Sequence, residues 1–388
     1  MAGFHQSTSF LVFHFTYLCN CKMNREKSHK KSALRVNTGI EKPEAVNPLL
    51  QQKPDKFKKN RVSPSEYLKG IQTGNRTLLS RAITLVESTL PEDSKAAGEL
   101  IRLCLPFSGK ALRMGVTGVP GVGKSTFIER FGLFLIENGH KVAVLTIDPS
   151  SMRSRGSILG DKTRMEELGN NSRAFIRPSA SAGTLGGVAR KTREAMILCE
   201  AAGYDIVFVE TVGVGQSETA VAQMVDFFLL LMLAGGGDEL QGIKRGIMEM
   251  ADLIVINKAD GENINKANLA KREYENALHL FPPLPNGWQP SVLTASALYG
   301  ENVPGIWDQI ESFMQLTKQN GFFEKNRKDQ AYQLFEETIH QSIHDHFFSH
   351  PLIKSRLKKY KAQILNQQLS PYEASQKLLD FYFHSFQK

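Results

Sequence analysis

The stretch GVPGVGKST, residues 118–126, decides the fold of this chain. It fills the pattern GxxxxGK[ST], directly after the apolar run LRMGVT and directly before the helical run STFIERFGLFLIEN. Glycines are needed in such a loop because the backbone must turn tightly and aim successive N–H groups at phosphate oxygens. The stretch therefore predicts a phosphate-binding loop between a strand and a helix.

The residues of this loop have separate expected tasks. Lys124 supplies a positive charge to the terminal phosphates and is a predicted catalytic residue, while the N-terminus of the following helix adds its dipole. Ser125 is expected to place its hydroxyl on Mg²⁺. The loop residues predicted to contact the nucleotide are Gly118, Val119, Pro120, Gly121, Val122, Gly123, Lys124, Ser125 and Thr126.

Apolar runs on both sides of the loop predict the strands of a sheet. They cover residues 112–118, 141–148, 174–179, 204–211, 226–232, 252–258 and 291–296, and helical segments with polar faces separate most of them. Continuous runs of Val, Ile, Leu and Phe suit strands that are buried on both faces. We therefore expect an α/β fold of the P-loop NTPase type, with a mostly parallel sheet, helices on both faces and ligands at the carboxyl ends of the strands.

The purine base of the bound nucleotide is predicted from NKAD, residues 257–260, which end one of these apolar runs. A carboxylate only accepts hydrogen bonds, so Asp260 suits the N1–H and amino group of guanine, whereas adenine has an acceptor at N1. GTP and GDP are therefore predicted over ATP, although NKAD alone often forms only a turn. In SAL, residues 296–298, the N–H of Ala297 is expected to reach guanine O6. The residues predicted to hold the base are Asn257, Lys258, Asp260, Ser296, Ala297 and Leu298.

Carboxylates near the ends of other strands predict a magnesium site. Asp148 ends the run in TIDPSS, and Glu210 ends another in VFVETVGVGQSE. Asp161, in SILGDKTRM, is expected to join them. Together with Ser125 these residues are the predicted metal ligands, and a helix or turn cap is the alternative for Asp148.

The motifs leave open which residue orients the attacking water. A small GTPase has a Gln four residues after the acidic residue of this strand, but here Val214 stands four residues after Glu210. Gln216 follows two residues later, so Glu210 and Gln216 are predicted catalytic residues beside Lys124. Slow intrinsic hydrolysis, accelerated by a partner, is the expected behaviour.

The chain outside the sheet predicts further parts. The expected division is residues 1–62 as a basic leader, 63–110 as an N-terminal helical module, 111–320 as the P-loop domain and 321–388 as a C-terminal helical segment. SPSEYLKGI begins with Ser63 and carries the signature of a capping box. In the last part, residues 328–350 and 371–386 predict amphipathic helices without a core of their own, so we expect dimerisation or a partner contact there.

The net charge of +9 is concentrated in the leader, because residues 22–61 hold 12 Lys and Arg against 4 Asp and Glu. A solvated, disordered leader is expected, with contact to RNA or an anionic surface as the alternative, so no nucleic-acid partner is predicted. The apolar run 10–18 is shorter than the roughly 20 residues that span a bilayer, so no membrane partner is predicted. Two interpretations stay open for residues 1–21: an upstream extension of the reading frame, with Met23 as the working start, and a mitochondrial leader.

Taken together, GVPGVGKST, IDPSSMRSRGSILGDKTRM, ETVGVGQSE, GGGDELQGIKRGI and NKAD resemble the methylmalonyl-CoA mutase-associated GTPases of the MeaB/ArgK type, in the G3E class, over about residues 63–388. The resemblance implies a GTP-hydrolysing chaperone of an adenosylcobalamin-dependent mutase, which gates cofactor loading and the protection or reactivation of the mutase. It also implies a homodimer built through the C-terminal helices and a third switch at residues 235–247. Arg155 stands where the family typically has a glycine.

Two other functions stay open at this point. A metallochaperone for another metal centre would need a Cys or His cluster near the switches, and Cys199 alone does not make one. A small-molecule or protein kinase would need a general base and an acceptor pocket beside the loop, which no motif supplies. The expected compartment is a bacterial cytoplasm, with the mitochondrial matrix as the alternative.

Overall fold

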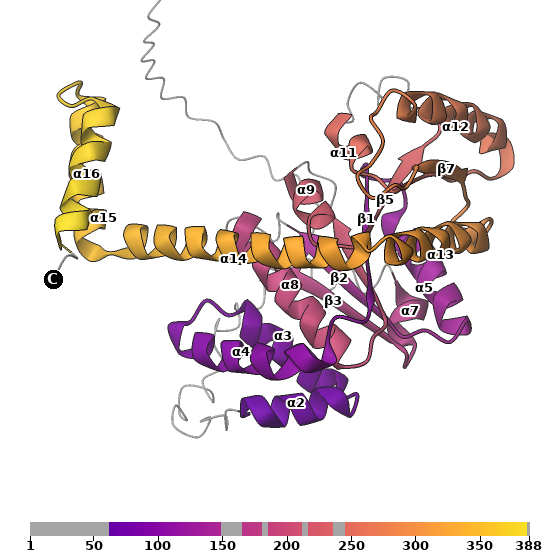
Figure 1. Ribbon diagram of the computed structural model, residues 1–388, viewed down its shortest axis with the longest axis horizontal. Coiled ribbons are helices and arrows are strands. Elements are labelled where there is room, and N and C mark those ends of the chain that lie inside the picture. The colour runs from indigo at the N-terminus through magenta and orange to yellow at the C-terminus, as the bar shows by residue number, and fades with distance from the viewer. Residues whose placement is uncertain (1–61, 149–164, 181–184, 212–215, 236–244, 386–388) are drawn as a thin grey trace, which may run out of the picture. The chain divides into compact units, whose positions relative to one another are not determined.

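The fold is built around a parallel sheet. The computed structural model describes residues 62–148, 165–180, 185–211, 216–235 and 245–385. Within these residues seven strands lie in the order β3-β2-β4-β1-β5-β6-β7, and neighbouring strands are parallel (Figure 1). The strands are β1 Leu112–Gly118, β2 Val142–Asp148, β3 Ala174–Ala180, β4 Ile206–Thr211, β5 Phe227–Leu233, β6 Leu253–Asn257 and β7 Ser291–Thr294. Each overlaps one of the predicted runs, so the predicted α/β sheet is confirmed.

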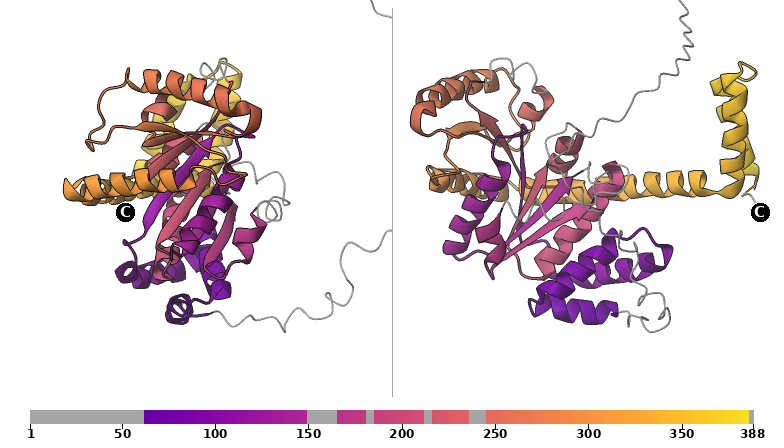
Figure 2. Two further views of the ribbon diagram at one scale, coloured as in Figure 1. Left: turned by 90° about the vertical axis from the view of Figure 1, so that its right-hand side faces the viewer. Right: turned by 180° about the vertical axis from the view of Figure 1, so that it is seen from behind.

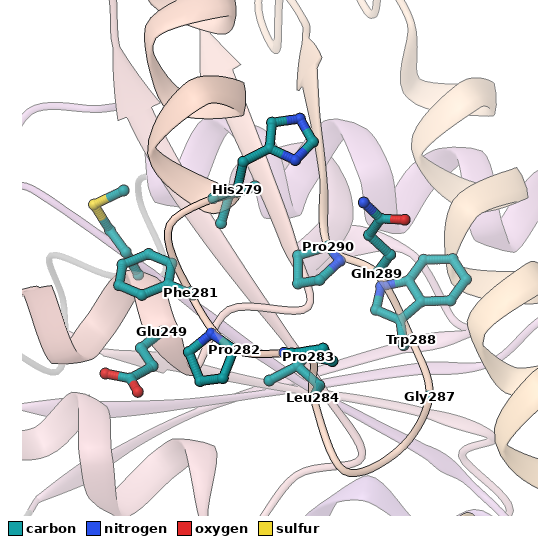
Figure 3. A pocket seen from close by; sticks show the side chains of 12 residues that line it. Glu249, His279, Phe281, Pro282, Pro283, Leu284, Gly287, Trp288, Gln289 and Pro290 are labelled. Carbon is teal, nitrogen blue, oxygen red and sulfur yellow. The ribbon is translucent and has the colours of Figure 1, made fainter.

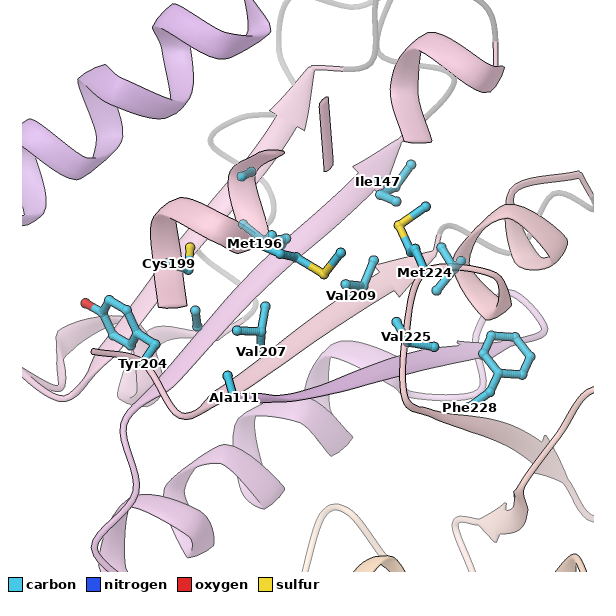
Figure 4. Close-up of a cluster of buried hydrophobic side chains, with 14 of the residues drawn as sticks. Ala111, Ile147, Met196, Cys199, Tyr204, Val207, Val209, Met224, Val225 and Phe228 are labelled. Atoms are coloured by element: carbon cyan, nitrogen blue, oxygen red, sulfur yellow. The ribbon is translucent and has the colours of Figure 1, made fainter. Parts of the chain in front are cut away.

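Helices cover both faces of the sheet, and successive strand residues alternate between them (Figure 2). On β4, Ile206 and Phe208 belong to the core cluster that includes side chains of α5, α7 and α13, whereas Val207 and Val209 belong to the cluster that includes side chains of α8, α9 and α12. Figure 4 shows part of the cluster that contains Val207 and Val209. These helices are α5 Lys124–Glu137, α7 Glu166–Asn170, α8 Leu185–Ala201, α9 Gln216–Ala222, α12 Ile264–Leu278 and α13 Val303–Gln319, and α11 Arg245–Glu249 precedes β6. Burial on both faces explains why the strands have continuous apolar sequences.

From residue 62 onward, three α-helices precede the sheet. They are α2 Pro64–Gln72, α3 Arg76–Glu87 and α4 Pro91–Cys104. The predicted capping box is present at the first, because the side chain of Ser63 accepts the N–H of Glu66 while the Glu66 carboxylate accepts the N–H of Ser63. α3 and α4 pack against α8, and Glu87 forms an ion pair with Arg177 of β3 at 2.8 Å. The helical segment is thus fixed to one face of the sheet domain.

Three further helices follow α13. They are α14 Phe322–Ser349, α15 Pro351–Leu365 and α16 Pro371–Ser385. The predicted helix over 328–350 corresponds to α14, which starts six residues earlier. The prediction missed α15, although Pro351 at its first position is a helix-start signal. α15 packs on both α14 and α16.

One buried ion pair joins α14 to the amino ends of β1 and β5. Arg327 donates from Nε to Oδ1 of Asp226 at 2.8 Å and from Nη2 to Oδ2 at 2.6 Å. It also donates to the carbonyl oxygens of Gly109 and Ala111. Asp226, whose side chain is 1% exposed, accepts the N–H of Arg113 as well. Both charges are therefore fully hydrogen-bonded, which a buried pair requires.

Replacing Arg327 with Met is expected to lower the free energy of unfolding by about 3–5 kcal/mol, because the Asp226 carboxylate would stay buried without its cation. Urea denaturation of the full chain measures the change. Lys328→Met is the matched control on the same helix: Lys328 is exposed, and its replacement is expected to change stability by at most about 0.5 kcal/mol. A loss below about 1 kcal/mol for Arg327→Met would mean that the pair behaves as a surface ion pair.

Candidate nucleotide-binding site

The phosphate loop links the end of β1 to the start of α5 and depends on its glycines. Gly118, Gly121 and Gly123 have φ values of +152°, +80° and +93°, in a region that residues with a Cβ rarely adopt. A Cβ on Gly118 would lie 2.4 Å from the carbonyl oxygen of Leu231, and one on Gly123 would lie 2.9 Å from Nδ2 of Asn257. The loop therefore runs against β5 and β6 at a distance that only glycine permits.

Lys124 is buried at the first position of α5. Its Nζ donates to the carbonyl oxygens of Gly118 at 2.8 Å and of Val119 at 3.3 Å. Burial lowers the pKa of Lys124, and the negative charges of Glu210 and Glu218 partly oppose that shift. The ammonium group thus lies inside the turn of the loop, where a phosphate would meet it.

Ser125 and Glu210 are brought together at the ends of α5 and β4. The Ser125 hydroxyl donates to Oε1 of Glu210 at 3.1 Å, and Glu210 is 7% exposed. Next to them the hydroxyls of Thr117 and Thr211 are hydrogen-bonded at 2.8 Å, which joins β1 to β4. A hydroxyl beside a carboxylate is a hard oxygen donor set, and this chemistry fits Mg²⁺ held jointly with phosphate and water.

Several predicted residues lie outside what the structure describes. The backbone of Asp148 ends β2 and pairs with Ala180, but its side chain and that of Gln216 are not described, and Asp161 and Arg155 are wholly outside the described residues. Most of the predicted third switch, residues 236–244, is outside them too. The roles of these residues stay predictions.

The predicted base-binding residues lie beside the phosphate loop. Asn257 donates from Nδ2 to the Val122 carbonyl at 2.8 Å, and its Oδ1 accepts the N–H of Ala297 at 3.0 Å. Lys258 donates to the Gly121 carbonyl at 2.8 Å. Asp260, the predicted guanine acceptor, receives the Ser296 hydroxyl at 2.6 Å. The N–H of Ala297, predicted to reach guanine O6, is hydrogen-bonded to Asn257 in this structure, so its contact with the base stays a prediction.

Two residues near the site were missed from the sequence. Arg130 of α5 donates from Nη2 to the carbonyl oxygen of Leu298 at 3.1 Å. This bond connects α5, the helix after the phosphate loop, to residues 296–298, which we call the base loop. Glu218 of α9 is 4% exposed. Arg130 carried no signal beyond its place in the helix, whereas Glu218 lies within the quoted ETVGVGQSE.

A pocket of about 400 Å³ lies apart from these residues (Figure 3). Met248 and Glu249 of α11 form one wall, and residues 278, 279, 281–284 and 287–290 form the rest. These segments precede β6 and β7, so the pocket is at the amino ends of those strands. The predicted nucleotide residues follow the carboxyl ends of their strands, at the opposite edge of the sheet.

The described residues contain no group of three or more His, Cys, Asp and Glu side chains placed to hold a metal ion. Both described cysteines are buried, and burial raises the pKa of the Cys104 thiol to about 11 and that of Cys199 still higher. Thiols with raised pKa values are poor metal ligands because the thiolate is the binding form. Among the helices of the described ranges, none has the length and apolar character needed to cross a bilayer.

The chain matches the family described as Methylmalonyl Co-A mutase-associated GTPase MeaB over residues 79–351. It is 46% identical to GTPase ArgK of Escherichia coli strain K12 over 322 residues, which cover 83% of this chain and 97% of that protein. It is 47% identical over 320 residues to the mouse Methylmalonic aciduria type A homolog, mitochondrial, with 80% of this chain and 77% of that protein covered.

A solved structure described as a LAO/AO transport system kinase has the same fold. Its TM-score is 0.67 at 40% sequence identity, and the match covers 83% of this chain and 98% of that one. The similarities in sequence and in fold extend over most of the chain and include the phosphate loop and the NKAD strand. The chain therefore belongs to the methylmalonyl Co-A mutase-associated GTPase family of the MeaB type and is a P-loop GTPase.

Proposed function

We propose that this GTPase is a chaperone of an adenosylcobalamin-dependent mutase, of the methylmalonyl-CoA mutase type, and that its nucleotide state gates cofactor loading and the protection or reactivation of the mutase. The family carries that association in its name. The observation that supports a nucleotide-gated role best is that Asn257 donates a hydrogen bond to Val122 of the phosphate loop and accepts one from Ala297 of the loop after β7. Through them, nucleotide bound at one loop acts on the other.

In this proposal the chain holds GTP by both ends. The loop of residues 118–126 surrounds the phosphates, with Lys124 as the cation, and Asp260 accepts hydrogen bonds from guanine. Ser125 and Glu210, together with Asp148 and Asp161, would hold Mg²⁺. The ion would neutralise charge on the phosphates during hydrolysis. Hydrolysis without a partner is slow, because no Gln stands at the usual position after Glu210.

We also propose a homodimer through the C-terminal helices. Large apolar side chains on α14 are exposed in the single chain: Tyr332, Phe335, Ile339, Ile343 and Phe348. The first four follow at intervals of three and four residues, so they share one face of the helix. An exposed apolar face of this length suits a second copy better than water. The compartment is that of the mutase, a bacterial cytoplasm or, as the alternative, a mitochondrial matrix, and relatives of both origins exist.

A kinase is the second candidate, because the solved relative carries that description. The two functions differ in the fate of the γ-phosphate. Release as inorganic phosphate with water as the acceptor supports the GTPase chaperone, and transfer to a small molecule or protein supports the kinase.

Asp260→Asn is expected to weaken GTP binding by about a hundredfold or more. The reason is the loss of two hydrogen bonds to a charged acceptor, each worth about 1.5–3 kcal/mol. The same variant should gain affinity for xanthosine triphosphate, whose carbonyl oxygen accepts from the new amide. Calorimetric titration with both nucleotides measures the exchange. Equal GTP affinity in the native and variant chains would remove Asp260 from the base site.

Association with the mutase is expected to depend on the nucleotide. Purified chain, loaded with a non-hydrolysable GTP analogue or with GDP, is titrated against methylmalonyl-CoA mutase, and the two affinities should differ at least about tenfold, a coupling of about 1.4 kcal/mol. The Lys124→Ala chain, which lacks the phosphate cation, is the control. Its affinity for the mutase should be the same with either nucleotide. If neither nucleotide form binds the mutase, the chaperone role is wrong.

Phe335→Glu is expected to shift the chain from dimer to monomer, because a charge would be buried in the apolar contact. Light scattering during size-exclusion chromatography measures the mass. Glu336→Gln, one residue away and exposed, is the control that should leave the mass unchanged. A native chain that is monomeric at high concentration would refute the proposed dimer.

A further inference from the structure

Glu218 is a buried carboxylate that none of the predicted roles uses. It lies in the first turn of α9, eight residues after Glu210, and is 4% exposed. Its Oε2 has no hydrogen-bond partner among the described residues. Such an oxygen is costly to leave unsatisfied, and buried polar groups without a partner need an explanation.

The packing of α9 places Glu218 near the phosphate loop. The chain passes from β4 to β5 across β1, because β1 pairs with both strands, and α9 packs on β1 and β4. A Cβ on Gly115 of β1 would lie 2.9 Å from Cγ1 of Val221, so Val221 lies directly over that strand. Glu218 is one helical turn before Val221 on the same face. A crossover helix runs back along its strands, so Glu218 is nearer the carboxyl end of β1, where the phosphate loop begins.

The electrostatics of Lys124 agree with this placement. Besides burial, two charges act on the lysine, those of Glu210 and Glu218. Lys124 is nevertheless not the direct partner of Glu218, because the ion pairs of the described residues do not join the two. Its Nζ donates instead to the carbonyls of Gly118 and Val119. The charge of Glu218 thus raises the pKa of Lys124, although no hydrogen bond joins the two side chains.

Glu218 and Glu210 differ in what they contact. Glu210 accepts the Ser125 hydroxyl on the α5 face, so it belongs to the predicted metal ligands. Glu218 approaches the end of β1 from the other face, with α9. The sequence has no Gln four residues after Glu210 to accept a hydrogen bond from the attacking water. The Glu218 carboxylate on the α9 side has an oxygen that could accept this bond instead.

We propose that Glu218 is the residue that orients the attacking water in GTP hydrolysis, by accepting a hydrogen bond from it at Oε2. This rests on the GTPase site described above. The water oxygen forms a bond to the γ-phosphorus while the bond from that phosphorus to the β,γ-bridging oxygen breaks. The electron pair stays on GDP, and the proton of the water ends on the released phosphate. Glu218 itself is unchanged at the end of the reaction.

The test separates hydrolysis from binding. Glu218→Ala is expected to slow single-turnover GTP hydrolysis about a hundredfold, while the affinities for GDP and for a non-hydrolysable GTP analogue stay within about threefold. Glu218→Gln keeps an acceptor oxygen and should retain more activity than the Ala variant. Glu194→Gln is the control, because Glu194 is a largely buried carboxylate of α8 that pairs with Arg190 at 3.6 Å and does not act on Lys124.

Thermal unfolding of each variant checks that it folds, and Glu218→Gln serves if the Ala variant does not. The inference is wrong if folded Ala variant hydrolyses GTP within about threefold of the native rate, or if its rate falls only because binding falls. A Gln variant as slow as the Ala variant would also overturn it, because the amide oxygen accepts hydrogen bonds too. A native chain that binds no guanine nucleotide would instead refute the proposed function of the site.

Discussion

The geometry of the nucleotide site depends on the amide of Asn257. One side of this amide donates to the phosphate loop at Val122, and the other accepts from the base loop at Ala297. Because Asn257 is 1% exposed, neither bond competes with water, and both gain strength from the surrounding low polarity. A planar amide fixes the direction of its donor relative to its acceptor. The spacing between the two loops is therefore fixed by this amide.

The parallel sheet explains why these residues meet. In the register of β1, β5 and β6, Gly118 lies level with Leu231, and Leu231 with Val255. Asn257 is two residues beyond Val255, so it extends past the end of β1 and faces the same side, the side covered by α5. Glu210 follows Phe208 by the same interval of two and meets Ser125 on that side. The period of two residues in a strand thus selects which strand-end side chains face the loop.

The sequence predicted this arrangement because each part of it is local. A strand buried on both faces is a continuous apolar run, and the loop and NKAD are short motifs at strand ends, so both can be identified without a partner. Contacts between distant residues left no such pattern. Asp226 is the first residue of a predicted strand, and nothing near it in the sequence indicates an ion pair, because its partner Arg327 follows 101 residues later. Glu218 lies inside the motif ETVGVGQSE, yet its side of the sheet follows only from tertiary packing, that of Val221 on Gly115.

The segment of residues 216–226, which contains α9, lies between the strand that carries Glu210 and α14. α9 begins just after the strand that carries Glu210, and the backbone that leaves it is bonded to α14. The Val225 carbonyl accepts Gln330 at 2.7 Å, and the Gln223 side chain accepts Gln333 at 3.2 Å. A displacement of α9 that extends to residues 223–225 would therefore act on these hydrogen bonds to α14. Residues 216–226 thus connect the segment that follows Glu210 to α14.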